Sequence, residues 1–145
     1  MADTETDALA KAKEMSIMGE KRNEEVRTIL APWFAERFAG FYPPYGWLDL
    51  VQEIHEHVVA VAPDYRITQV KEKFGTLCFY VDPRTIPHHV RDACRNYVLA
   101  KQEESSGICQ SCGAPQAGSV ERGWVATLCD ACAILDDARG YPLYR

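Results

Sequence analysis

The chain has 145 residues, of which 47% are hydrophobic and 26% are charged, and its formal net charge is −5 at pH 7. This composition is typical of a soluble globular protein with one domain, or with a core domain and a small appended module. The acidic charge is spread along the chain, so no segment has the basic surface with which nucleic-acid-binding proteins neutralise phosphates.

The longest apolar runs are too short to cross a bilayer, and the chain does not open with a basic segment followed by an apolar one. We therefore expect no membrane span, no export signal and a cytoplasmic location. In that reducing compartment, closely paired cysteines hold metal ions rather than form disulfides.

The N-terminal third of the chain changes character near residue 23. Residues 1–22 have few large apolar side chains, and we expect a helical or partly disordered arm there. From residue 23 the apolar residues follow helical spacing, which predicts a helix that Pro32 kinks or restarts. The apolar stripe of this helix consists of Val26, Ile29, Leu30, Trp33 and Phe34.

The middle of the chain predicts an α+β core domain over residues 23–104. Residues 47–62 form the clearest amphipathic helix, which Pro63 ends. Two segments rich in β-branched and aromatic residues, 65–70 and 76–81, flank a turn at Phe74-Gly75 and predict a hairpin. A further helix is expected over 87–101. The fold class is thus helices packed on a short antiparallel sheet.

Residues 105–145 form a separate module that contains two cysteine pairs. The pairs have the spacing C-x2-C-x16-C-x2-C, and the four residues are Cys109, Cys112, Cys129 and Cys132. Each pair can hold one edge of a metal ion from a tight turn, and two pairs complete a tetrahedron. The spacing predicts one structural Zn²⁺ ion per chain.

The parts around the cysteines predict a treble-clef arrangement. Residues 109–113 have the pattern of a zinc knuckle, residues 124–126 suit a strand of a small hairpin, and the second pair begins a helix. So short a segment cannot build a hydrophobic core alone. Structural zinc contributes roughly 10–16 kcal/mol to the folding of such small modules.

The stretch from Cys109 to Gly140 resembles a GATA-type zinc finger, which implies a treble-clef zinc fold. The resemblance rests on a C-x2-C-G start and an L-C-x-A-C helix start, which match here at Cys109, Cys112, Gly113, Leu128, Cys129, Ala131 and Cys132. The stretch differs from the DNA-reading family in a shorter loop and in Asp130, which replaces asparagine. Asp136 and Asp137 also stand where that family has basic residues. A GATA-like DNA-binding regulator is therefore our second hypothesis.

A longer stretch, from Gly46 to Cys132, resembles a group of small proteins encoded by phages and prophages. The shared motifs are Lys-Glu-Lys-Phe-Gly-Thr-Leu-Cys-Phe-Tyr at 71–80, the C-x2-C-G knuckle, and Thr-Leu-Cys-Asp at 127–130. Small accessory phage proteins often bind and redirect host machinery, including defence systems. The resemblance therefore implies a viral protein that acts by protein–protein contact in the cytoplasm of a bacterial host.

Five residues are candidates for contact with a partner. Arg66, Lys71 and Lys73 can form a basic hairpin edge with Phe74 at its tip, although Glu72 interrupts it. Trp124 can be partly exposed in so thin a module, and exposed aromatic residues often dominate the binding energy of interfaces. The simpler interpretation is a solvated strand end and a core tryptophan.

No pattern in the chain indicates an active site. His55 and His57 do not form the H-E-x-x-H motif of zinc proteases, and we expect them at the edge of the core. His88 and His89 fit an exposed helix start. Four thiolate ligands also leave no open position on the metal for water or substrate. Cys78 and Cys94 are expected to pack as small hydrophobic side chains. We therefore expect a binding protein rather than an enzyme.

Overall fold

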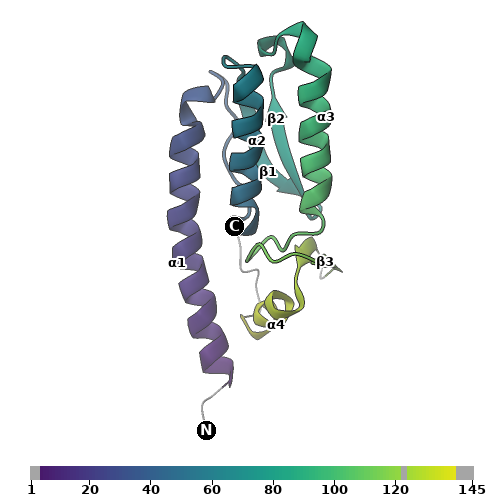
Figure 1. The fold of residues 1–145 in the computed structure, drawn as a ribbon. Coiled ribbons are helices and arrows are strands. Elements are labelled where there is room, and N and C mark those ends of the chain that lie inside the picture. The colour runs from purple at the N-terminus through teal and green to yellow at the C-terminus, as the bar shows by residue number, and fades with distance from the viewer. Residues whose placement is uncertain (1–3, 122–123, 140–145) are drawn as a thin grey trace.

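The computed structural model describes residues 4–121 and 124–139 (Figure 1). Helices and two small antiparallel sheets confirm the predicted α+β class. Three short 3₁₀ turns, at Ala31–Trp33, Tyr45–Trp47 and Pro83–Thr85, connect the longer elements. Those elements are α1 (Thr4–Leu30), α2 (Leu48–Val61), β1 (Ile67–Lys73), β2 (Thr76–Val81), α3 (His88–Ser105), β3 (Gly118–Glu121), β4 (Val125–Leu128) and α4 (Asp130–Arg139).

Within the described ranges, no helix combines the length and the apolar character that crossing a membrane requires.

The predicted hairpin is present as β1 and β2, and its turn has an unusual residue. Lys73 pairs with Thr76, which leaves Phe74 and Gly75 as a two-residue loop. Their φ angles are 52° and 79°, so both lie in the left-handed region, as a type I′ turn requires. The glycine suits this conformation, but a left-handed phenylalanine is uncommon because its side chain crowds the backbone.

Other parts of the chain cover both edges of this two-stranded sheet. Residues 34–42 run along β1, where Ala35 N donates to Ile67 O at 2.9 Å and Tyr42 N donates to Val70 O at 2.7 Å. On the other edge, two side chains of α3 accept from backbone N–H groups of β2. Gln102 Oε1 accepts from Phe79 at 2.8 Å, and Ser105 Oγ accepts from Leu77 at 2.9 Å. At these positions, the edges of the sheet are not open to pair with another strand.

Helix α1 is longer than the predicted helix and passes without a break through residue 22. It ends at Leu30, because Pro32 lies within the following 3₁₀ turn, Ala31–Trp33, instead of kinking a continuous helix. The predicted apolar stripe of this helix is wrong at Ile29, which is 41% exposed. Val26 and Leu30 are fully buried, as predicted. Figure 1 shows α1 running beside α2 and on toward α4, and it packs against both helices.

Helix α2 forms the centre of the main core. Its predicted inner face is buried at Leu50, Val51, Ile54 and Val58, while Val61 in its last turn is 45% exposed. The structure differs from the sequence expectation at His55, which is buried rather than placed at the core edge.

The buried His55 ring has defined partners on two sides. Its Nδ1 atom lies 2.6 Å from the Tyr65 hydroxyl, and Trp33 packs edge-on against the ring at 4.6 Å. Burial lowers the pKa of His55, although the nearby Glu56 carboxylate opposes this change. His57, two residues later, is exposed and stacks on Tyr97 at 3.6 Å.

We predict that His55 makes the protein less stable in mild acid. As the pH falls below about 6.5, the unfolded chain protonates this histidine while the folded chain resists protonation. Its contribution to stability is therefore present above that pH and is lost below it. Urea unfolding at pH 7.5 and 5.5 should show a smaller acid-induced loss for His55→Gln than for the wild type. The exposed-site control His57→Gln should lose as much stability as the wild type, and equal losses in all three proteins would contradict the prediction.

Candidate metal centre

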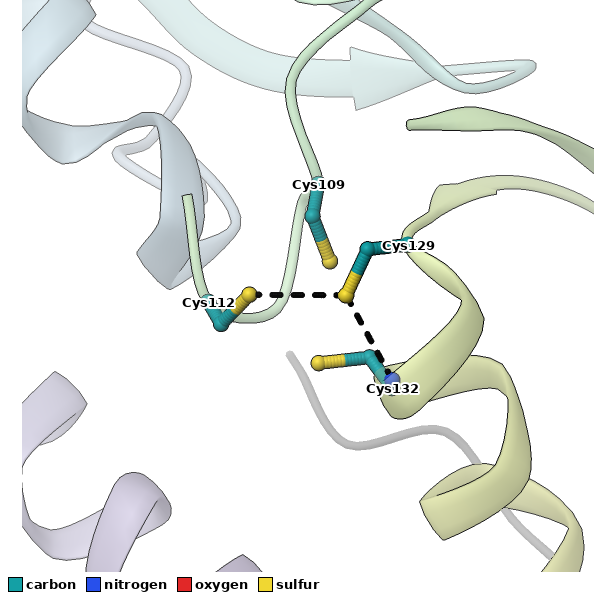
Figure 2. A group of neighbouring side chains, drawn as sticks. All are labelled: Cys109, Cys112, Cys129 and Cys132. Carbon is teal, nitrogen blue, oxygen red and sulfur yellow. Dashed lines mark hydrogen bonds between the residues drawn. The ribbon is translucent and has the colours of Figure 1, made fainter. Parts of the chain in front are cut away.

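The four paired cysteines converge at one point in the structure (Figure 2). Their sulfur atoms all lie within 4.8 Å of one another, and the Cys112 and Cys129 sulfurs are 3.7 Å apart. All six cysteines of the chain lie in the described ranges, and each is free of disulfide bonding. A tetrahedral zinc ion with Zn–S bonds of about 2.3 Å separates its sulfur ligands by about 3.8 Å. The cluster thus has the dimensions of a four-thiolate metal site.

The four ligands come from the predicted knuckle, hairpin and helix. Cys109 and Cys112 lie in the loop that follows α3, while Cys129 lies between β4 and α4. Cys132 lies in the first turn of α4, where the positive end of the helix dipole favours a thiolate. Cys109 and Cys132 are buried, whereas Cys112 is exposed.

Backbone hydrogen bonds shape the knuckle around the first pair. Gly113 N donates to Cys109 O at 2.8 Å and so closes the turn. Gly113 has a φ of +83°, which favours glycine at this position. In the second pair, Cys132 N donates to the Cys129 sulfur at 3.5 Å. These contacts hold the sulfurs in place through the backbone.

The pKa values of the two buried cysteines move in opposite directions. The pKa of Cys109 is lowered to about 4, first because the Cys132 thiol donates a hydrogen bond to its sulfur. Backbone N–H groups of the knuckle lower the Cys109 pKa further. The pKa of Cys132 is raised, because its proton is shared with Cys109 and its side chain is buried. The hydrogen bond between the two side chains thus favours the thiolate at Cys109 and the thiol at Cys132.

This donor set fits a metal ion such as zinc. Sulfur-only tetrahedral sites are typical of zinc and of iron–sulfur centres. A divalent cation displaces the thiol protons of the cluster and lets all four sulfurs bind as thiolates. The four cysteines fill a tetrahedral coordination shell, as in structural rather than catalytic sites.

The knuckle is pressed against the core domain at Gly46 and Trp47. Gly46 N donates to Gln110 O, and Trp47 Nε1 donates to Ile108 O, both at 2.8 Å. A Cβ atom on Gly46 would lie only 2.0 Å from Cys109 O. The core therefore approaches the metal loop so closely that a side chain has no room.

A second contact joins the module to the β1–β2 hairpin. Thr127 Oγ1 donates to Gly75 O at 2.7 Å. The Thr127 backbone in turn pairs with Gln110, whose N donates to Thr127 O at 2.9 Å and whose Oε1 accepts from Thr127 N at 2.5 Å. The metal loop, strand β4 and the hairpin turn are thus connected by hydrogen bonds.

The structure brings together three of the five predicted partner-binding residues. Lys73, Phe74 and Trp124 line one surface hollow of about 520 Å³. The Phe74 side chain is 74% exposed and that of Trp124 is 38% exposed. Lys71 instead lies over the Tyr80 ring, with Nζ 5.8 Å from its centroid. Arg66 lies before the start of β1, where its Nη1 donates to Tyr65 O at 3.1 Å.

The cysteines outside the cluster and the histidine pair at the start of α3 lie where structural roles were expected. Cys94 is 1% exposed, and burial raises its pKa, so its thiol is neither accessible nor readily ionised. Cys78 is half-buried on β2, and His88 and His89 are exposed at the start of α3. Sequence reasoning did not identify Gly46, Gln110 or Thr127 as supports of the metal loop. Only Gly46 has a local signal in the sequence, because it directly precedes the helix predicted over residues 47–62.

Compared with known proteins, the chain matches no family model, and no curated protein or solved structure is significantly similar to it.

We predict that Gly46→Ala disrupts the metal loop without changing a ligand. The added methyl group would be 2.0 Å from Cys109 O, so the backbone of the knuckle or of the core must move. Overpacking of this kind costs about 1–3 kcal/mol. Urea unfolding and metal content should both show the loss. Gly118→Ala is the matched control, because nothing lies within 4 Å of the position that its Cβ would take. Equal stability and metal content in the two variants would contradict this account of the contact.

Proposed function

We propose that this protein is a binding protein that one structural zinc ion holds together and that acts by contact with another protein. The observation that carries the proposal is the position of the metal module. It lies directly against the hairpin turn that presents an exposed aromatic residue. We call Lys73, Phe74 and Trp124 together the hairpin patch.

Zinc is the ion that best suits this site. It has no geometric preference beyond what its ligands impose, and four thiolates at tetrahedral spacing are its usual structural ligand set. The hydrophobic cluster around the site is small, with Ala126 and Leu128 packed beside two of the cysteines. A module with so little interior needs the free energy of metal binding to fold.

The turn residue Phe74 supports a role in binding. Type I′ turns prefer Asn-Gly, and phenylalanine in a left-handed conformation is costly. Contacts of the Phe74 side chain offset little of this conformational cost, because 74% of the side chain is exposed. A residue that breaks a local folding rule without an internal compensation is often kept for function.

The second half of the hairpin patch comes from the metal module. Trp124 directly precedes β4. Phe74 lies fifty positions earlier in the chain, in the turn between β1 and β2. The bond between Thr127 and Gly75 keeps these two regions together. Clustered exposed aromatic residues with a neighbouring cation are the composition expected at the centre of a protein interface.

The charge of the surrounding surface favours a protein over DNA. Glu72 and Glu121 line the same hollow as Lys73, so the hairpin patch has no excess of positive charge. The resemblance to phage-encoded proteins supports a partner among the host or defence proteins of a bacterium. We assign the protein no reaction of its own, because the four thiolates fill the metal's coordination shell.

Loss of one zinc ligand should unfold the module and spare much of the core. We predict that the wild type is purified with one zinc ion per chain and that Cys112→Ser retains little. The variant should melt at a lower temperature and lose the NMR signals of residues 109–132 from their folded positions. Cys78→Ser removes a thiol outside the cluster and should keep both the zinc ion and the melting temperature. A metal-free Cys112→Ser protein that melts like the wild type would refute the structural role of the metal.

The variant Phe74→Asn tests the role of this side chain in partner binding without disturbing the fold. It creates an Asn-Gly type I′ turn, so we predict unchanged or slightly raised stability together with loss of partner binding. The tagged wild type and variant can be compared by quantitative mass spectrometry of the proteins that each retains from bacterial host cells. Tyr42→Asn, which removes a 63% exposed aromatic residue elsewhere, is the control. If all three proteins retain a partner equally, the hairpin patch is not the site that binds that partner. Retention of DNA that weakens steeply with salt would favour the GATA-like alternative.

A further inference from the structure

A groove between α3 and β2 lies apart from both the metal centre and the hairpin patch. Figure 1 shows α3 running alongside β2, and the groove between them encloses about 380 Å³. Sites for small molecules commonly measure roughly 300–1,000 Å³. None of the residues that line this groove belongs to the metal centre or to the hairpin patch.

The floor of the groove is apolar. Phe79 of β2, Ile86 of the following loop, and Cys94 and Val98 of α3 form it, and each side chain is 7% exposed or less. Leu99, which is 52% exposed, stands at the mouth and extends the apolar surface outward. Such a floor suits a hydrocarbon chain and offers no strong hydrogen-bonding group to a polar one.

The rim of the groove is rich in hydrogen-bond donors. Arg91 donates to Ile86 O from Nε at 3.3 Å and from Nη2 at 3.0 Å, which fixes its guanidinium at the rim and leaves Nη1 free of that carbonyl. Arg95 lies one helical turn later. Gln102 uses its Oε1 to accept from Phe79, so its amide N–H groups remain as donors.

The two arginines carry charge that the described part of the chain does not neutralise. Among the residues whose side chains the structure describes, neither Arg91 nor Arg95 takes part in an ion pair with a carboxylate. Asp92 is the one acidic residue that lines the groove. A local excess of guanidinium groups is notable in a chain of net charge −5, and guanidinium is the side chain best suited to hold a carboxylate through paired N–H groups.

We propose that this groove binds a small amphiphilic carboxylate, such as a fatty acid of medium chain length. Its hydrocarbon chain covers the floor formed by Phe79, Ile86 and Val98. Its carboxylate accepts hydrogen bonds from Arg95 and from the free N–H groups of Arg91. A neutral apolar molecule would gain no charge-assisted hydrogen bond from the two guanidinium groups, and an apolar cation would be repelled by them.

Titration of the full zinc-loaded chain with sodium decanoate below its micelle concentration tests the proposal by NMR. We expect saturable shifts at residues 79–81 and 91–99, with the metal module unchanged. Decylammonium, which has a similar chain and the opposite charge, should produce no saturable shifts there. Arg95→Gln should weaken decanoate binding at least about fivefold, as expected for the loss of one charge-assisted hydrogen bond.

Two further variants keep the test independent of folding defects. Arg37→Gln removes one positive charge from the segment along the other edge of the sheet and should leave decanoate affinity unchanged. Leu99→Gln changes an exposed side chain at the mouth and should weaken binding without unfolding the helix. The proposal is wrong if decanoate causes no saturable shifts, if decylammonium binds equally well, or if Arg95→Gln binds decanoate like the wild type.

Discussion

Four cysteine sulfurs held within 4.8 Å of one another are the constraint on which the C-terminal third of the structure depends. As thiolates without a cation, the four sulfurs would repel one another, and Cys109 and Cys132 are also buried. The pKa values of Cys109 and Cys132 move in opposite directions, because the hydrogen bond between the two side chains favours one thiolate beside one thiol. A divalent cation removes the repulsion by binding all four sulfurs at once, and the free energy of that binding becomes folding free energy of the module.

The same constraint extends into the core domain through two close backbone contacts. Gly46 meets the knuckle where no side chain fits, and Gly75 accepts a hydrogen bond from Thr127 of β4. The metal module therefore also helps to shape a surface, because Phe74 and Trp124 line one hollow and the Thr127–Gly75 hydrogen bond joins the two segments that carry them. The residues that line the α3–β2 groove all lie between Val58 and Gln102, outside the metal module.

Local patterns predicted more of this protein than long-range contacts did. The cysteine spacing identified the four residues whose sulfurs cluster, because each pair is set by one tight turn, and the Phe74-Gly75 turn identified the hairpin. Helical periodicity predicted the inner face of α2 but not the exposure of Val61 at its end. Residue spacing shows which side of a helix faces the core, but it does not show how far along the helix the core extends. The closeness of Gly46 to the knuckle left no pattern in the sequence, because it depends on how two distant segments dock.

X-ray absorption at the zinc edge of the purified protein tests the central claim most directly, because it reports the atoms bound to the metal. The account predicts a single shell of four sulfur atoms at about 2.3 Å. A shell that contains nitrogen or oxygen, or protein that carries no stoichiometric zinc and has its cysteines joined as disulfides, would contradict it.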